Sequence, residues 1–126
     1  MTKEELFAWI RAEFEVEPDY PWNDGNAVLR HRENNKWFGL VMSVQRAKLG
    51  LSGNGAIDVL NIKGDPDLIC FLRTQKGYLP AYHMNKNSWI TIVLEDFKLE
   101  DEIKNLVSSS FKETSPKIKR ARSKQE

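Results

Sequence analysis

The chain has 126 residues, of which 40% are hydrophobic and 10% aromatic, so it is long enough for one packed domain and too apolar for a disordered chain. No apolar run approaches the roughly 20 residues that span a bilayer, and the charged, amphipathic start of the chain lacks the pattern of a signal peptide. The single cysteine, Cys70, excludes an internal disulfide and is expected to be a small core residue. We therefore expect a cytoplasmic protein with no membrane contact.

The net charge of +1 conceals an uneven distribution of charged residues. Residues 30–86 carry nine Lys or Arg against four acids, a surplus of +5, and residues 117–126 carry a further +4. The acids gather in the first 24 residues and in residues 95–113, so that residues 1–116 together carry −3. Segregation of this kind predicts a basic face on a nearly neutral protein.

The first half of the chain predicts one helix and three strands. Thr2 and Glu5 have the spacing of a capping box, and apolar residues recur at helical spacing as far as about Glu15. Pro18 and Pro21 end this helix and open a connecting loop. Alternating apolar residues, separated by polar and Gly-rich turns, then predict strands over residues 27–32, 36–44 and 56–63.

The second half predicts a helix, a strand and a further helix. Asp65 is a good N-cap, Pro66 suits the first helical position, and Gly77 is placed to cap the end of this second helix. A strand follows over residues 89–95, and a third helix with acids in its first turn follows over residues 99–111.

These elements predict the fold class. The order α-β-β-β-α-β-α indicates an α+β fold in which an antiparallel sheet carries helices on one face. Residues 1–115 are expected to form a single domain. Residues 116–126 are basic and polar and are expected to be a disordered tail.

The sequence has few of the features that enzymes need. His31 shares a strand face with Ala27 and Leu29, which favours a structural role, and it is far from His83 in the sequence. There is no phosphate loop, nucleophile elbow or zinc-binding motif, and Cys70 lies in an apolar helix without an adjacent base. We therefore expect no catalytic activity, no metal and no cofactor.

The stretch GYLPAYHMNKNSWITI, residues 77–92, gathers polar and aromatic side chains around one turn. In a structural interpretation, Asn85 to Asn87 form the turn before a strand, and the nearby aromatic residues pack at the edge of the core. In a functional interpretation, His83, Asn85 and Lys86 project as a recognition loop, since Asn pairs with bases and Lys with phosphates. The residues alone leave both interpretations open.

Four segments, in the same order, resemble the MmcQ/YjbR family. They are PDYPWND (18–24), LRHRENNKWFGLVMSV (29–44), LNIKGDPDLICFLR (60–73) and PAYHMNKNSWITIVLED (80–96). The resemblance covers roughly residues 1–111 and implies a compact α+β domain with the frataxin-like, or CyaY-like, topology. It also implies a DNA-binding role, because that fold is similar to the double-wing DNA-binding module of a phage transcription factor.

The family segments coincide with the basic middle of the chain. By alternation, Arg30 and Arg32 share a sheet face, and an uncovered face of this kind would lie against phosphates. We therefore predict a small non-enzymatic protein that contacts DNA phosphates through a basic sheet and loop face, aided by the basic tail. The predicted nucleic-acid-binding residues are Arg30, Arg32, Lys36, Arg46, Lys48, Lys63, His83, Asn85, Lys86, Lys117, Lys119, Arg120 and Arg122.

Two alternatives remain open. The chain could be a protein-interaction or small-ligand-binding module, because Tyr82, His83, Asn85 and Trp89 combine aromatic anchors with a few polar groups. A pocket lined by these side chains, without a continuous positive face, would favour this alternative. Iron binding through the acidic first helix is the third hypothesis, and it rests on the frataxin-like topology alone.

Overall fold

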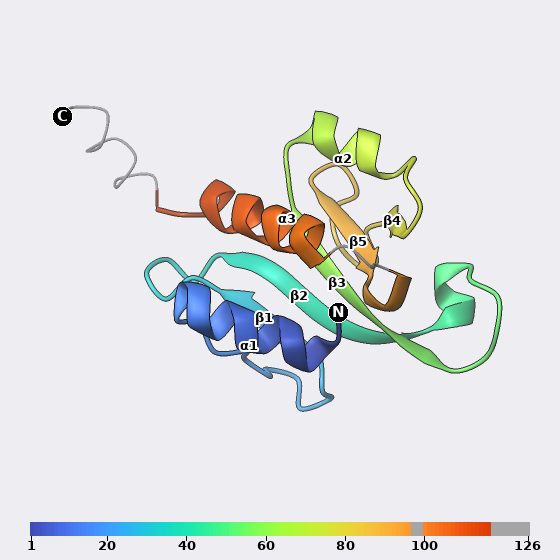
Figure 1. The fold of residues 1–126 in the computed structure, drawn as a ribbon, viewed down its shortest axis with the longest axis horizontal. Coiled ribbons are helices and arrows are strands. Elements are labelled where there is room, and N and C mark those ends of the chain that lie inside the picture. The colour runs from blue at the N-terminus through green and yellow to red at the C-terminus, as the bar shows by residue number, and fades with distance from the viewer. Residues whose placement is uncertain (97–99, 117–126) are drawn as a thin grey trace.

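The computed structural model describes residues 1–96 and 100–116, and within them the chain forms three α-helices and a five-stranded antiparallel sheet (Figure 1). The elements are α1 (Lys3–Phe14), β1 (Ala27–Arg30), β2 (Trp37–Gln45), the 3₁₀ helix η1 (Arg46–Leu49), β3 (Ala56–Lys63), α2 (Pro66–Leu72), β4 (Tyr78–Pro80), β5 (Trp89–Val93), the 3₁₀ helix η2 (Leu94–Asp96) and α3 (Glu100–Glu113). The strands lie in the order β1-β2-β3-β5-β4. The predicted α+β class is confirmed, with β4 as one strand more than the sequence predicted.

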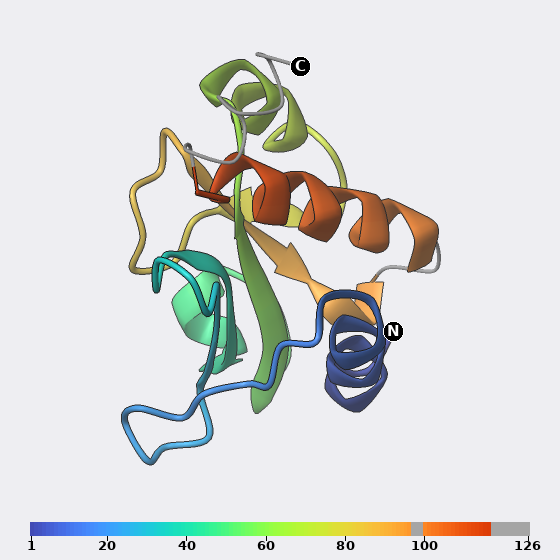
Figure 2. The same cartoon turned by 90° about the vertical axis from the view of Figure 1, so that its left-hand side faces the viewer.

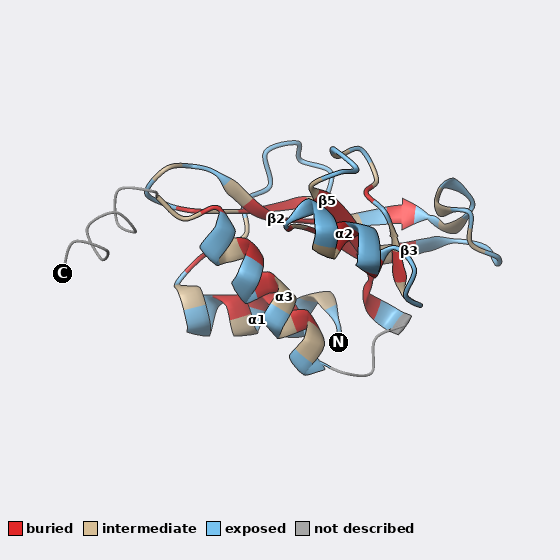
Figure 3. Ribbon diagram, turned by 90° about the horizontal axis from the view of Figure 1, so that it is seen from above, coloured by how far each residue is buried: buried red, intermediate tan, exposed pale blue. Residues whose placement is uncertain are grey.

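One face of the sheet packs against the helices and forms the main core. Figure 3 shows α1 and α3 side by side on this face, with buried segments in both helices. Leu6 and Ile10 of α1 and Ile103 of α3 are fully buried there. Ile69 of α2 joins the same core. The apolar side chains that recur about every 3.6 residues along the helices therefore pack against those that recur every second residue along the strands, in a single apolar layer.

The predicted start of α1 is confirmed in detail. The Thr2 hydroxyl oxygen accepts a hydrogen bond from the Glu5 amide at 3.1 Å, and the Glu5 carboxylate accepts one from the Thr2 amide at 2.9 Å. The hydrogen bond that the Thr2 amide donates to the carboxylate lowers the pKa of Glu5. The helix ends at Phe14, and Glu15 follows in the left-handed conformation with φ 56°.

Four sequence predictions about local structure are wrong. The first strand ends at Arg30, because its register with β2 shifts between Leu29 and Arg30, so that Arg32 lies in a turn instead of on the strand face. Helix α2 ends at Leu72, five residues before Gly77, whose φ of 90° leads directly into β4. Cys70 is exposed rather than a core residue, because the apolar side of α2 faces the core through other residues.

The fourth correction concerns the second face of the sheet, which is covered and apolar. In Figure 2 the helices α1 and α3 lie on the right of the sheet, and the loops before β1 and β5 lie on its left. Strands β2, β3 and β5 carry apolar residues on both faces, as strands with two covered faces do. A second apolar cluster results, formed by Val44, Ile57, Val59 and Val93 with Met42, Leu49, Leu51, Leu79 and Tyr82.

Candidate ligand-binding groove

On the second face of the sheet, three adjoining hollows meet at His83. Their volumes are about 340, 360 and 390 Å³, and neighbouring hollows also share Met42, Lys48 or Tyr82. Each volume falls within the roughly 300–1,000 Å³ that is typical of ligand sites. We call this continuous depression the His83 groove, and its principal lining residues are Trp22, Asn26, Trp37, Met42, Lys48, Tyr82, His83 and Lys86.

A buried hydrogen-bond network holds the loop that carries His83. The Thr91 hydroxyl accepts a hydrogen bond from the Tyr82 amide at 2.9 Å and donates one to the side-chain carbonyl of Asn61. The Asn61 side-chain nitrogen donates in turn to the sulfur of Met42 at 3.6 Å, and Met42 lines the groove. Thr91 and Asn61 are fully buried, so this network fixes the loop to the sheet.

The turn after His83 is the one that the sequence predicted. The Asn85 side-chain oxygen accepts a hydrogen bond from the Asn87 amide at 2.9 Å, and the Asn85 carbonyl accepts one from the Trp89 amide at 2.9 Å. Asn85 therefore orders the entry to β5, and Trp89 is buried at the start of that strand. Neither residue lines the groove.

His83 adopts an uncommon backbone conformation. Its φ of 60° lies in the left-handed region, which is infrequent for residues other than glycine. Its ring lies 4.0 Å from the ring of Tyr82, in an edge-to-face arrangement with an interplanar angle of 62°. The backbone thus holds an exposed imidazole above the point where the three hollows meet.

One end of the groove is cationic. Lys48 of η1 and Lys86 of the loop before β5 line the same hollow of about 390 Å³, together with His83. Neither lysine forms an ion pair with any residue in the described part of the chain. No carboxylate of residues 1–96 or 100–116 lines this hollow, so none of the described lining residues balances the charge of the two lysines. Three of the predicted site residues are therefore brought together here.

The other end of the groove is aromatic. Trp22 comes from the loop before β1 and Trp37 from the start of β2, and their ring centroids lie 5.8 Å apart at an interplanar angle of 76°. Trp22 is 50% exposed. Neither tryptophan was predicted as a site residue from the sequence, because a β-bridge between Asp19 and Val28 brings the loop of Trp22 to the sheet, and no local pattern indicates that contact.

The other predicted cations among the described residues do not line the His83 groove. Arg30 forms an ion pair with Asp19, and the Arg46 guanidinium lies 2.6 Å from the Glu95 carboxylate. Arg32 lines a small hollow against Phe111 on the helix side of the sheet. Lys36 is exposed in the turn between β1 and β2, and Lys63 ends β3 beside α3. Lys117, Lys119, Arg120 and Arg122 lie outside the described residues.

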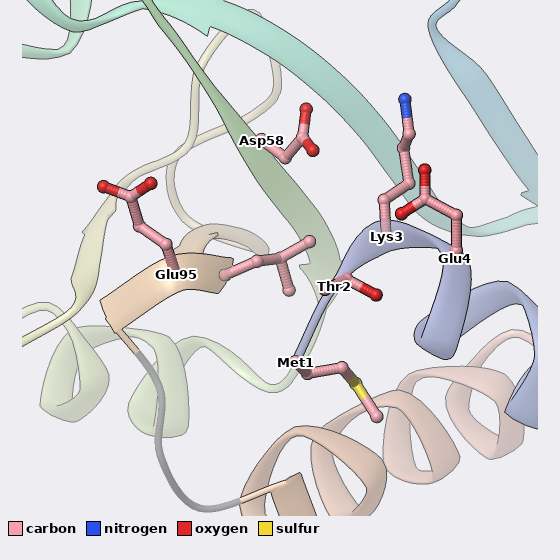
Figure 4. Close-up of a pocket in the computed structure, with 7 residues that line it drawn as sticks. Met1, Thr2, Lys3, Glu4, Asp58 and Glu95 are labelled. Carbon is pink, nitrogen blue, oxygen red and sulfur yellow. The ribbon is translucent and has the colours of Figure 1, made fainter.

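Another hollow, of about 320 Å³, lies at the start of α1 (Figure 4). It is lined by charges of both signs, with Lys3 beside Glu4, Asp58 and Glu95. None of the predicted site residues that the structure describes lines it, although the Glu95 carboxylate is the partner of Arg46. The mixed charge offers no clear complement to a charged ligand, so this hollow is not the candidate site.

His31 has the structural role that its position in the sequence indicated. It is buried against the ring of Phe111, with 4.2 Å between ring centroids, and its Nε2 lies 2.7 Å from the Thr114 hydroxyl. That hydroxyl donates to the Ser110 carbonyl at 2.8 Å, so the imidazole Nε2–H is the donor to Thr114. Burial lowers the pKa of His31 below its ordinary value of 6.5.

The described residues contain no group of three or more His, Cys, Asp or Glu side chains placed to hold a metal ion. Among the helices in residues 1–96 and 100–116, none has the length and apolar character needed to cross a membrane.

Comparisons with known proteins give the same fold and one family. The Bacillus subtilis (strain 168) protein YyaQ is 46% identical over 113 residues, which are 88% of this chain and 96% of that protein. A crystal structure of a Pseudomonas syringae protein is 36% identical, with a TM-score of 0.87 over 91% of this chain and all of that one. A Deinococcus radiodurans protein with a DUF419 domain, 20% identical and with a TM-score of 0.65 over 87% of this chain and 75% of its own, shares the fold. The model of the YjbR family matches residues 11–113, and the chain therefore belongs to the YjbR family.

Proposed function

We propose that this chain is a non-enzymatic binding module that holds an anionic ligand in the His83 groove. The observation that carries the proposal is that Lys48 and Lys86, 38 positions apart in the sequence, line one hollow to which the described part of the chain contributes no carboxylate. The adjoining hollow of about 340 Å³ also contains Lys48 and lacks acids.

The physical setting favours an anion at this end. Two ammonium groups that form no ion pair with the described residues keep their donors available, and a concave surface with apolar lining residues weakens solvent screening. The floor consists of residues such as Leu49 and Ala81, and the neighbouring Tyr82 and His83 add polar atoms at the rim. The arrangement supports binding and orientation of a ligand.

Calorimetric titration with pyrophosphate tests the proposal. We expect the double variant Lys48→Gln, Lys86→Gln to bind at least about tenfold more weakly than the unchanged chain, because two charge-assisted contacts are lost. The control is Lys76→Gln, Lys112→Gln, which changes the net charge equally but alters two exposed lysines outside the groove. Equal loss in both double variants, or no binding by the unchanged chain, would contradict the proposal.

DNA binding is the second candidate function. It is favoured by the position of Lys48, His83 and Lys86 on one face, together with the +4 charge of residues 117–126. The pairing of Arg30 and Arg46 with carboxylates reduces the number of cations available to a duplex. Fluorescence anisotropy of a labelled duplex should show affinity that falls steeply with salt, and removal of residues 117–126 should flatten that slope. Absence of binding even at low salt would reject this candidate.

A further inference from the structure

The aromatic end of the groove indicates what kind of anion it accommodates. We propose that the ligand is a free mononucleotide whose base packs at Trp22 and Trp37 and whose phosphate lies between Lys48 and Lys86. This inference rests on the proposed function and specifies the ligand class of that same groove.

The two tryptophans form a corner that suits a flat ring. Their interplanar angle of 76° means that a ring stacked on one tryptophan meets the other edge to face, and both contacts are favourable for aromatic groups. Leu40 and Met84 line the same hollow of about 360 Å³ and add apolar surface. Trp22 is half exposed, so stacking would remove a large apolar area from water.

Acceptors at this corner match a base that carries an amino group. Asp24 lines the hollow, and its two carboxylate oxygens accept from the Asn26 amide at 3.0 Å and from the Asn26 side-chain nitrogen at 3.3 Å. Each carboxylate oxygen has capacity for a further donor. An exocyclic amino group, as on adenine, can supply it, whereas the oxygen of uracil would be repelled.

The number of lysines that line the groove suits a single phosphate group better than the repeated phosphates of a nucleic-acid strand. Two of the other predicted cations, Arg30 and Arg46, are already paired with Asp19 and Glu95. The phosphates of a longer strand could contact these two arginines only by displacing the carboxylates. The charge distribution favours a free nucleotide over a polymer.

Calorimetric titrations with AMP, UMP, ribose 5-phosphate, adenosine and a short oligo(dA) test the assignment. We expect AMP to bind at least about tenfold more tightly than ribose 5-phosphate, which lacks the base, and more tightly than adenosine, which lacks the phosphate. UMP should bind more weakly than AMP.

A matched pair of variants locates the base. Trp22→Leu should weaken AMP binding at least about fivefold and leave ribose 5-phosphate binding unchanged, because only the stacked base is affected. Tyr20→Leu is the control, since Tyr20 is 48% exposed in the same loop but does not line the groove.

The outcomes separate this inference from the proposed function. If pyrophosphate and ribose 5-phosphate bind as tightly as AMP, or if Trp22→Leu has no effect on AMP, the nucleotide assignment is overturned while the anion site stands. Oligo(dA) binding more than about tenfold tighter than AMP would also overturn it, in favour of a polymer. If neither pyrophosphate nor any nucleotide binds, the proposed function itself fails.

Discussion

At the scale of single residues, buried polar side chains determine where the loops on the second face of the sheet lie. Thr91 uses its one hydroxyl group twice, as acceptor from the Tyr82 amide and as donor to Asn61. Tyr82 precedes His83, so the same hydroxyl positions the imidazole over the groove. The geometry of the candidate site therefore depends on a residue that does not line it.

Thr91→Val should lower the free energy of unfolding by about 1–3 kcal/mol, because the Tyr82 amide and the Asn61 side chain each lose a buried partner. Hydrogen exchange at the Tyr82 amide should also accelerate, which reports the loosened loop directly. Thr74→Val is the matched control, since the Thr74 hydroxyl is exposed and should cost less than about 1 kcal/mol. Equal costs at both positions would contradict the role of Thr91.

His31 makes stability depend on pH. Burial lowers the pKa of His31 in the folded state. Below about pH 6.5, the His31 side chain is therefore protonated to a greater extent in the unfolded chain than in the folded chain. The free energy of unfolding should therefore fall as the pH drops from 7 to 5, and urea denaturation at several pH values measures this. His31→Gln should reduce the fall, whereas His83→Gln, at an exposed position, should preserve it. An unchanged pH dependence in His31→Gln would contradict the assignment.

At the scale of elements, one serine of α3 joins two strands. The Ser110 hydroxyl donates to the Phe38 carbonyl of β2 at 2.7 Å and accepts from the Lys63 amide of β3 at 3.0 Å. The pairing of β2 with β3 ends at Gly39 and Ile62. Phe38 and Lys63 are the next residues on the two strands, just beyond this last pair. The helix therefore satisfies backbone groups that the sheet leaves open.

Ser110→Ala should lower the free energy of unfolding by about 1–3 kcal/mol, because it leaves buried backbone groups without a partner. Its neighbour provides the control: Ser109 is exposed, and Ser109→Ala should change stability by no more than about 0.5 kcal/mol. Chemical denaturation of both variants measures the difference. Indistinguishable midpoints would show that Ser110 is not a structural link.

The elements that the sequence predicted well are those with strong local signals. The strand over residues 56–63 has the observed bounds of β3, and the capping box places the start of α1 correctly. The predicted end of β1 was wrong because pairing with β2 decides it, and that of α2 was wrong because the chain leaves the helix through a turn at residues 73–77, before Gly77 could cap it. The shift of register at Arg30 depends on pairing with Trp37, and the short strand β4 exists only because β5 lies beside it.

At the scale of the whole molecule, the two faces of the sheet have different coverings. Helices cover one face and form the core, whereas loops cover the other and leave the His83 groove between them. Lys48, His83 and Lys86 could be selected from the sequence as polar residues in loops. Trp22 and Trp37 could not, because the folding of the chain, and not their spacing, brings them to the same groove.

NMR chemical-shift mapping with pyrophosphate tests the central claim, that the chain folds to place Lys48, His83 and Lys86 around one anion site. The account predicts saturable shifts concentrated at these three residues and their immediate neighbours, with little change at the turn that carries Arg32 and Lys36. Shifts concentrated at that turn instead, or no shifts at all, would contradict it.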